Sequence, residues 1–479
     1  MNALHADLMT LLPELVLAAG GMITLLAGVL RSEKGMGASS LLAMIVLVVA
    51  AWFVMAGSGA VSAFGGAFVV DDFTRFAKLL ALLGAAAALI MAQGYFGLEK
   101  IARFEFPVLV IFSVLGMMLM ISAASFIALY MGLELQSLAL YVLAAFDRDS
   151  AKSSEAGLKY FVLGALSSGM LLYGISMIYG FTGTTEFATV AHIVKTSGVS
   201  IGLIFGLVFL IAGLAFKISA VPFHMWTPDV YEGSPTPITA YFSMAPKVAA
   251  MALFLRAILI PFPDAIHEWR QIIVAASVLS MVLGAIAAIG QTNIKRLMAY
   301  SSIGHMGYAL LGLAAGTTLG VEGVLLYLLI YVVTNAGVFT CILLMKRDGQ
   351  MVENISDLAG LARTQPRLAF AFAALMFSLA GIPPLAGFFA KFFVFLAAIE
   401  AHLYVLAVIG VLASVIGAYY YVRIVKIIYF DDPAPAFDGE MGAGLGTILV
   451  GASVFTIFFI VGAAPMISAA ATAAKALVP

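Results

Sequence analysis

Long apolar runs, separated by short clusters of glycine, proline and charged residues, occupy almost the whole chain. A run of about twenty apolar residues is long enough for an α-helix to cross the hydrocarbon core of a bilayer. The pattern therefore predicts an all-α polytopic membrane protein with about fourteen transmembrane helices. The predicted spans are residues 9–30, 40–58, 73–95, 106–122, 125–146, 155–180, 200–225, 237–259, 271–290, 297–315, 321–345, 367–399, 403–428 and 444–469.

The composition agrees with this fold class and argues against several kinds of site. The chain has 479 residues, of which 63% are hydrophobic and only 10% are charged, whereas soluble domains carry about 25% charged residues. One cysteine, Cys341, cannot form an intramolecular disulfide or hold an iron–sulfur cluster by itself. The net charge is −1, and we find no P-loop and no GxGxxG that opens a βαβ unit. We therefore expect no nucleic acid, metal or cofactor on this chain.

Basic residues are distributed unevenly between the two sets of loops. By the positive-inside rule, the richer set is cytoplasmic, and both termini are then expected on the outer side of the membrane. The richer set, in loops after odd-numbered spans, holds Arg31, Lys34, Lys100, Arg103, Arg148, Lys152, Lys295, Arg296, Lys346, Arg347, Arg363, Arg367, Arg423 and Lys426. The other set holds only Arg75, Lys78, Lys195, Arg256, Arg270 and Lys475. The basic residues left within the spans are Lys159, Lys217, Lys247 and Lys391.

A weak internal repeat is visible in the order of polar residues. Segment 155–168 resembles segment 322–335 in the spacing of Glu, Tyr and two adjacent polar residues, and segment 218–222 resembles 379–383. Five helices separate the two copies, so they are inverted in the membrane, which is a common plan of transporters. Chance similarity between apolar helices is the alternative. We expect an N-terminal three-helix segment, two inverted five-helix repeats (spans 4–8 and 9–13) and a C-terminal helix, at residues 1–105, 106–260, 261–430 and 431–479.

Spans 7 and 12 are predicted to be broken helices. Span 7 contains Lys217 and Pro222, and span 12 contains Pro383-Pro384 between two glycines, followed by Lys391. Proline removes a backbone hydrogen bond and clashes with the preceding turn. Non-helical backbone at membrane depth persists only where it is buried in protein or lines a hydrated cavity. Proline kinks alone are often structural, but a break beside an intramembrane lysine, at two repeat-related positions, favours a function.

Four charged residues, Glu134, Lys217, Lys247 and Lys391, lie deep within apolar runs. A charge at the centre of a membrane helix is unfavourable by about 2.5–3.5 kcal/mol on insertion scales, so it is rarely kept without a use. A lysine whose carboxylate partner approaches and retreats can take up and release a proton, since a pair at about 4 Å interacts by roughly 4 kcal/mol. We expect Glu134 and Lys217 to form such a pair, and the four residues to form a proton path.

Three further residues are weaker candidates for the same path. His305 ionises near working pH and can relay protons between lysines, but a histidine hydrogen-bonded to a neighbouring helix is an equally good interpretation. His224, close to the break in span 7, has the same two interpretations. Lys159 lies about one turn into span 6, where it can join the path or extend its amine to the interface.

Two polar stretches carry a resemblance to a known family. They read Val221-Pro-Phe-His-Met-Trp-Thr-Pro-Asp-Val-Tyr-Glu-Gly-Ser-Pro-Thr-Pro237 and Asn293-Ile-Lys-Arg-Leu-Met-Ala-Tyr-Ser-Ser302. With the lysines and broken helices, the whole chain resembles the antiporter-like membrane subunits of proton-translocating NADH:quinone oxidoreductase (respiratory complex I), which are related to Mrp-type sodium/proton antiporters. The Tyr-Glu-Gly-Ser-Pro sequence and a lysine rather than a glutamate at 391 favour one member of that family.

The resemblance implies roles, partners and a location. Carried over by position, Glu134 modulates the first lysine, Lys217 is that lysine, Lys247 is the central relay and Lys391 faces the exit. NADH, FMN, iron–sulfur clusters and quinone are implied in partner subunits. The implied partners are other membrane subunits of the complex, namely a small adjacent subunit and a second antiporter-like subunit, together with the lipid bilayer. Fourteen spans are typical of the bacterial (or plastid-type) form rather than the animal-mitochondrial one, and the bacterial form implies the inner membrane.

Two other functions compete with a proton-translocating subunit of a redox-driven translocase. A free-standing sodium/proton antiporter is disfavoured because only one carboxylate, Glu134, is clearly deep, and no sodium-site carboxylate pair is visible. A purely structural membrane spacer does not account for three deep lysines. Electron transfer itself is not expected in this chain.

Overall fold

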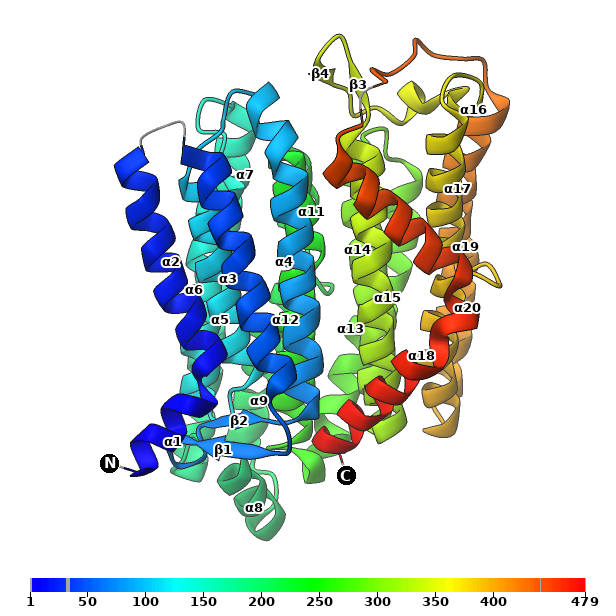
Figure 1. Cartoon of the computed structure of the whole chain (residues 1–479). Coiled ribbons are helices and arrows are strands. Elements are labelled where there is room, and N and C mark those ends of the chain that lie inside the picture. Colours follow the sequence, from blue (N-terminus) through cyan, green and yellow to red (C-terminus); the bar gives the residue numbers. More distant parts are fainter. Residues whose placement is uncertain (1, 32–34, 440, 479) are drawn as a thin grey trace.

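The computed structural model describes residues 2–31, 35–439 and 441–478, and its helices run side by side through one bundle (Figure 1). Eleven described helices are long and apolar enough to cross a membrane. The shorter α5, the polar-ended α14 and the broken pair α17–α18 make fourteen crossings in the described residues. The all-α polytopic fold class is therefore confirmed. Lys34, one of the loop residues counted above, lies outside the described residues.

The N-terminal half of the chain contains the elements up to α12. Their bounds are α1 Asn2–Thr10, α2 Leu12–Arg31, α3 Met36–Ala56, β1 Val61–Ala63, β2 Phe68–Val70, α4 Asp72–Leu98, α5 Glu105–Ile121, α6 Phe126–Ala144, α7 Ala151–Thr182, α8 Phe187–Ser197, α9 Ile201–Ile218, α10 Thr227–Gly233, α11 Thr236–Ser243 and α12 Ala245–Leu259. The strands β1 and β2 form a small antiparallel hairpin at the end of the bundle where both termini lie (Figure 1).

The C-terminal half contains the elements from α13 onward. Their bounds are α13 Ile266–Ile289, α14 Ile294–Ala315, α15 Thr318–Leu343, β3 Lys346–Arg347, β4 Gln350–Met351, α16 Leu361–Thr364, α17 Pro366–Ala380, α18 Ala386–Glu400, α19 Tyr404–Phe430 and α20 Ala443–Leu477. Helix α20 crosses obliquely over this half and packs on α15 and α4 (Figure 1). We call the end of the bundle where α7, α14 and α17 begin the basic end.

The observed helices follow the predicted spans, with three differences. Span 7 ends at Ile218 rather than near residue 225, and span 8 is interrupted at Met244 between α11 and α12. The last helix contains Pro465, as the predicted span did, but continues to Leu477 rather than ending near residue 469. The short helices α1, α8 and α10 and the two hairpins were not predicted, since none of them is an apolar run of membrane-spanning length.

The breaks in spans 7 and 12 have the same local form. Helix α9 ends at Ile218 and is followed by Ser219 with φ of 63°, whereas α17 ends at Ala380 and is followed by Gly381 with φ of 87°. Both residues are in the left-handed region that terminates helices. The structure thus aligns Ser219 with Gly381, one residue away from the alignment suggested by the sequence. The division of the chain into two repeats remains a prediction.

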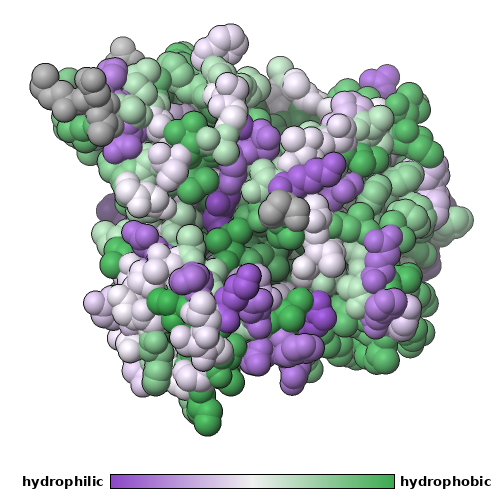
Figure 2. Space-filling view, turned by 90° about the horizontal axis from the view of Figure 1, so that it is seen from below, coloured by the Kyte–Doolittle hydropathy of each residue, from purple (hydrophilic) through white to green (hydrophobic). Residues whose placement is uncertain are grey.

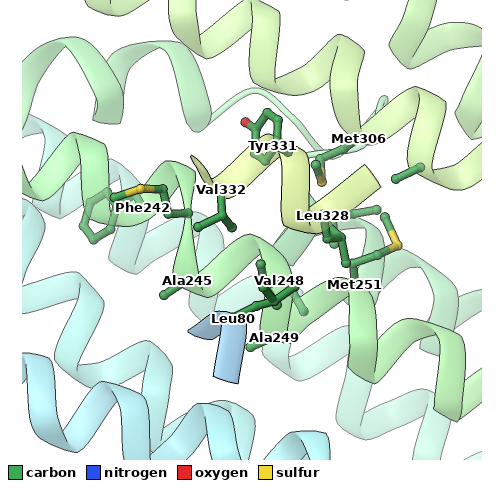
Figure 3. Packing of buried hydrophobic residues seen from close by; sticks show 14 of the residues in the cluster. Leu80, Phe242, Ala245, Val248, Ala249, Met251, Met306, Leu328, Tyr331 and Val332 are labelled. Atoms are coloured by element: carbon green, nitrogen blue, oxygen red, sulfur yellow. The ribbon is translucent and has the colours of Figure 1, made fainter. Parts of the chain in front are cut away.

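The middle of the bundle is filled by apolar side chains from helices far apart in the sequence. Leu80 of α4, Val248 of α12, Met306 of α14 and Leu328 of α15 are all buried there (Figure 3). Helix α4 approaches α12 closely because Gly84 has no side chain, and a Cβ at Gly84 would lie 3.0 Å from the Ala245 nitrogen. This packing joins the N-terminal helices to both halves.

The outer surface is apolar along the flanks and polar at the ends. Large apolar side chains are exposed along α7, for example Leu158, Phe161 and Leu166. In the view from the end that carries the termini, hydrophilic residues gather toward the middle and green apolar residues dominate the rim (Figure 2). Exposed apolar flanks of this kind are expected of a surface that faces lipid or other membrane subunits.

Candidate functional site: buried lysines at the broken helices

Lys247 binds the end of the first broken helix. Its ammonium donates to the carbonyl oxygen of Ile218, the last residue of α9, at 2.9 Å, and to the hydroxyl of Ser219. The last carbonyls of a helix lack intrahelical donors and carry the negative end of the helix dipole. A buried cation is therefore stabilised at this position, and Lys247 is 1% exposed.

Lys391 makes the same two kinds of contact at the second break. Its ammonium donates to the carbonyl oxygen of Ala380, the last residue of α17, at 2.9 Å, and to the Ser414 hydroxyl at 2.8 Å. Lys391 is itself 8% exposed. We expected Lys217 to be the counterpart of Lys391, but the structure gives that position to Lys247. This relation could not be seen in the sequence because Lys247 lies in α12, 29 residues after Ile218.

Lys217 lies just before the first break, and its partners come from α6. Its ammonium donates to the Ser137 hydroxyl at 2.7 Å and to the Tyr141 hydroxyl at 3.3 Å. Glu134 instead accepts a hydrogen bond from the Ser168 hydroxyl at 2.5 Å. Among the described ion pairs, none joins Glu134 to Lys217, so the expected direct pair is not formed in this structure.

The reason lies in the geometry of α6. Glu134 and Ser137 are three residues apart, so they lie on one face of the helix about one turn from each other. Ser137 contacts Lys217, whereas Glu134 contacts α7 and is only half-buried. The Glu134 carboxylate therefore lies about one helical turn from the serine that contacts Lys217, and not in contact with the lysine.

Each of the three lysines also lies near an aromatic face. The Nζ atoms are 5.6 Å from the Tyr141 ring, 5.4 Å from the Trp226 ring and 5.0 Å from the Tyr308 ring, for Lys217, Lys247 and Lys391 respectively. Cation–π attraction operates within about 6 Å and strengthens in a desolvated site. Serine and aromatic side chains thus surround each of the three ammonium groups, a shared pattern that we did not identify in the sequence.

His305 lies near Lys391 in a small polar cluster. Its Nδ1 is 2.5 Å from the Tyr327 hydroxyl, and its Nε2 is 3.0 Å from the Tyr421 hydroxyl. His305 and Lys391 both line a cavity of about 10 Å³. A cavity of this size is close to the volume needed for one water molecule between polar groups. His305 is hydrogen-bonded to neighbouring helices and also close to the lysine, so both interpretations of this residue stay compatible with the structure.

The two remaining candidates lie farther from the buried lysines. His224 lies half-buried in the turns between α9 and α10. Lys159, whose side chain is 40% exposed, pairs with Glu155 and Asp229 at 2.6 Å each. Lys159 therefore belongs to an ionic network at the basic end. Direct hydrogen bonds within the described residues do not join all the candidates into one continuous chain.

The sequence analysis missed two buried ion pairs. Lys78 contacts Glu14 at 2.6 Å, with both side chains 2% exposed, and Arg256 contacts Asp71 at 2.7 Å. We had counted Lys78 and Arg256 with the outer side of the membrane, and they lie near the ends of predicted spans 73–95 and 237–259, inside α4 and α12. Glu14 and Asp71 are therefore buried carboxylates, whereas Glu134 is only half-buried. The sequence signal for the first pair was that Glu14 and Lys78 each lie near the start of an apolar run.

The arrangement defines a class of protein before any comparison is made. It is a polytopic membrane bundle in which lysine ammonium groups cap broken helices in the interior. Among the described residues, no three His, Cys, Asp or Glu side chains gather into a set that could hold a metal ion. Chemically, such a site can bind, hold and release protons at nitrogen and hydroxyl groups.

Comparison with known proteins identifies the family. The family model described as "NADH:quinone oxidoreductase/Mrp antiporter, TM" matches residues 123–417, and the chain belongs to this family. The chain is similar to "NADH-quinone oxidoreductase subunit N" of Parvibaculum lavamentivorans, with 61% identity over 98% of this chain and 97% of the relative. It is also similar to "NADH-quinone oxidoreductase subunit N 1" of Rhizobium meliloti, with 56% identity over 99% of each chain.

Solved structures agree with the fold. A chain of respiratory complex I from Thermus thermophilus superposes with a TM-score of 0.82 and 32% identity, covering 96% of this chain and 99% of that chain. A chain of the Mrp complex from Dietzia superposes with a TM-score of 0.85 over 98% of this chain and 97% of its own length. The Dietzia chain is 23% identical, so this likeness concerns the fold alone.

Proposed function

We propose that this chain is the N-type proton-translocating membrane subunit of a bacterial NADH:quinone oxidoreductase, the counterpart of subunit 2 in mitochondria. The energy of electron transfer from NADH to quinone, released in other subunits, drives protons across the membrane through this chain. NADH, FMN, iron–sulfur clusters and quinone then belong to those subunits. Identities of 61% and 56% to proteins named as subunit N, over nearly the whole chain, support this assignment.

The observation that carries the mechanism is the set of three buried ammonium groups, each held by a serine hydroxyl and an aromatic face. We assign the proton path to Glu134, Lys217, Lys247 and Lys391, in that order. Glu134 senses a neighbouring subunit because it is half-buried on the side that α6 and α7 expose. His305, on α14, relays protons to Lys391 through the small cavity that both residues line.

The neutral and charged forms of a lysine at a broken helix differ in their contacts. A charged Lys247 donates to the Ile218 carbonyl and the Ser219 hydroxyl. A neutral amine can accept from that hydroxyl, so the hydrogen bond reverses its direction when the proton leaves. The same exchange at Ser414 serves Lys391. Each lysine thus loads a proton beside one helix end and releases it when its neighbour changes charge.

The orientation and the partners follow from the same proposal. The basic end faces the cytoplasm, and both termini, which lie together at the other end, face the periplasm (Figure 1). The exposed flanks of α6 and α7 contact a small adjacent membrane subunit, and a second antiporter-like subunit contacts the other half. His224 and Lys159 lie on the cytoplasmic half of the path.

Transport by membranes that contain this chain tests the assignment. Vesicles that carry the assembled oxidoreductase should acidify when NADH is oxidised, and vesicles that carry this chain without its partners should show no sodium/proton exchange. Robust sodium/proton exchange without partners would overturn the proposal and favour a free-standing Mrp-type antiporter.

A further inference from the structure

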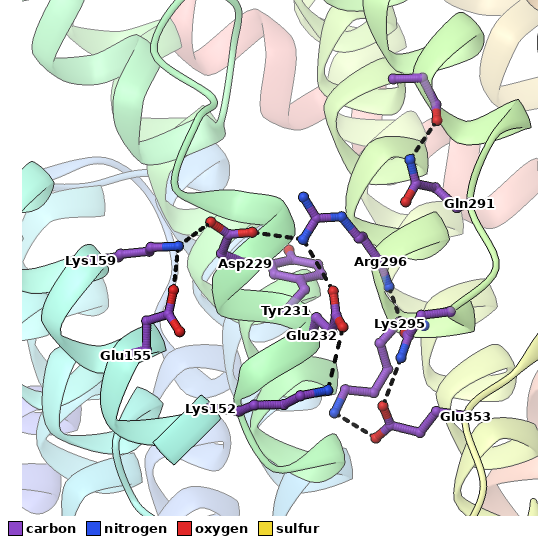
Figure 4. Close-up of polar contacts among 12 residues, drawn as sticks. Lys152, Glu155, Lys159, Asp229, Tyr231, Glu232, Gln291, Lys295, Arg296 and Glu353 are labelled. Atoms are coloured by element: carbon purple, nitrogen blue, oxygen red, sulfur yellow. Dashed lines mark hydrogen bonds and ion pairs between the residues drawn. The ribbon is translucent and has the colours of Figure 1, made fainter. Parts of the chain in front are cut away.

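The short helix α10 connects the first broken helix to an ionic network at the basic end. Asp229 of α10 accepts hydrogen bonds from Lys159 of α7 at 2.6 Å and from Arg296 of α14 at 2.7 Å (Figure 4). Arg296 also bonds Glu232, one turn farther along α10, at 3.1 Å. One aspartate therefore holds a cation from each half of the chain.

The network is electrically balanced, and it borders a groove. Its cations are Lys152, Lys159 and Arg296, and its anions are Glu155, Asp229 and Glu232. Four of these residues line a groove of about 190 Å³, namely Lys152, Glu155, Asp229 and Glu232. Burial alone would raise the pKa of the Asp229 carboxyl, but the hydrogen bonds from Lys159 and Arg296 hold that pKa below its ordinary value. Asp229 is therefore a fixed anion at neutral pH.

The first turn of α10, which carries Asp229, also touches the contacts of Lys247. The Thr227 hydroxyl donates to the Ser219 hydroxyl at 2.6 Å, and Ser219 is the hydroxyl that contacts the Lys247 ammonium. Trp226, immediately before α10, donates its indole N–H to the carbonyl of Phe216 at 3.0 Å. Its ring also lies under the Lys247 ammonium, 5.4 Å from Nζ.

Helix α7 holds the N-terminal turn of α10 with two consecutive residues. Lys159 binds Asp229, and the ring of Tyr160 stacks on Trp226 with centroids 4.3 Å apart and an interplanar angle of 8°. A helix of seven residues has little stability of its own, so these contacts fix its place. A shift of α10 would move Thr227 and Trp226 together.

We propose that Asp229 is a positioning residue for Lys247: by binding Lys159 and Arg296 it fixes α10, and α10 places the Thr227–Ser219 hydroxyl pair and the Trp226 ring against the ammonium. The inference rests on the proposed proton path and adds a residue outside the membrane spans to it. Loss of a bond between Asp229 and Lys159 or Arg296 is then felt at Lys247, and α10 links the basic end of both halves to the central relay.

The test uses the assembled oxidoreductase in proteoliposomes and measures protons pumped per NADH oxidised. We expect Asp229→Asn to lower this ratio by about two- to threefold, a size usual for residues that act through a network, while uncoupled NADH oxidation is retained. Asp229→Glu, which keeps the anion, should recover most of the ratio. Glu155→Gln is the matched control, because it removes the other carboxylate from Lys159 without releasing α10.

A second variant separates positioning from general loss of structure. Thr227→Val removes the hydroxyl at nearly constant volume and should lower the ratio by itself. If Asp229 acts through Thr227, then adding Asp229→Asn to Thr227→Val produces little further loss. Where Asp229→Asn fails to assemble, Arg296→Gln, which removes one of the two cations, replaces it in the same experiment.

Three outcomes would contradict the inference or the function behind it. A wild-type ratio in assembled Asp229→Asn, or losses that multiply in the double variant, would overturn the role of Asp229. Lys247→Met, measured in parallel, distinguishes failure of this inference from failure of the proposed function. If Lys247→Met pumps normally, the proposed function fails; if it loses pumping while Asp229→Asn does not, only this inference fails.

Discussion

Lys247 and Lys391 occupy equivalent positions at two broken helices. Lys391 lies in α18, the helix that directly follows its break, whereas Lys247 lies in α12, which follows its break only after α10 and α11. Each ammonium donates to the carbonyl of the residue that ends the helix before the break, at 2.9 Å in both cases, and to a serine hydroxyl. The equivalence explains why both breaks need a basic residue: the free carbonyls and the helix dipole at membrane depth would otherwise lack a partner.

Removing either serine hydroxyl should have the same effect. A hydrogen bond to a charged group contributes about 1.5–3 kcal/mol, so Ser219→Ala and Ser414→Ala should each weaken retention of a charged lysine and reduce proton pumping with NADH oxidation preserved. Ser176→Ala, at an exposed position of α7, serves as the control in the same proton-per-NADH measurement. Equal pumping by all three variants would show that the hydroxyls are not used.

Gly164 controls the position of Tyr141 beside Lys217. A Cβ at this glycine would collide with the Tyr141 hydroxyl, which lies 3.3 Å from the Lys217 ammonium. Gly164→Ala should therefore displace Tyr141 and weaken coupling by about 0.5–2 kcal/mol, seen as fewer protons per NADH. Gly169→Ala, in the same helix with nothing within 4 Å of its Cβ, should pump normally. Equal pumping by the two variants would argue against a role for Tyr141.

The sequence predicted the membrane spans and both breaks because hydropathy and proline act locally. It also found the depth of Lys217, Lys247 and Lys391, since each lies in an apolar run. Contacts between distant residues were not predictable: Lys247 reaches Ile218 across 29 residues, and the Ser137 that binds Lys217 is 80 residues away. The direct contact of Glu134 with Lys217 is not formed in this structure because helix rotation, which spacing alone does not give, directs Glu134 to Ser168.

Lys78 and Glu14 illustrate a second limit of the sequence. Both lie near the ends of predicted spans, where a charge normally reaches water, yet tertiary packing leaves each side chain 2% exposed. Positive-inside sorting therefore counted Lys78 with the outer side of the membrane. Burial of span ends depends on the neighbours α1 and the β1–β2 hairpin, neither of which was predicted.

The Lys78–Glu14 pair makes a stability prediction. Removing one member of a buried ion pair leaves an uncompensated charge and is unfavourable by about 3–5 kcal/mol, whereas replacing both can be nearly neutral. Lys78→Met and Glu14→Gln should each lower the melting temperature and the amount of assembled complex, and the double variant should recover most of both. A double variant as unstable as the worse single variant would contradict this account of the pair.

The Lys295–Glu353 pair predicts a dependence of stability on pH. Burial raises the pKa of the Glu353 carboxyl, but the charge and hydrogen bond of Lys295, with a hydrogen bond from Asn293, outweigh burial and lower it below its ordinary value of 4.5. A carboxyl with a lowered pKa in the folded state stabilises above its ordinary pKa, and this contribution disappears as the pH falls through the folded value.

Thermal unfolding of the purified complex measures the effect of this pair. Glu353→Gln should unfold at a lower temperature than the wild type at pH 7, and the difference should shrink as the pH falls below 4.5. Asp264→Asn, which removes an exposed carboxylate, should follow the wild type throughout. A difference for Glu353→Gln that grows in acid would contradict the assignment.

The most direct test of the proton path is the number of protons pumped per NADH by an assembled complex that carries both Lys217→Ala and Lys247→Ala. The account predicts that this ratio falls sharply, while electron transfer from NADH to quinone continues under uncoupled conditions, because the buried ammonium groups carry the proton and not the electron. Full proton pumping by the double variant would contradict the account and would leave the chain as a structural spacer in the membrane.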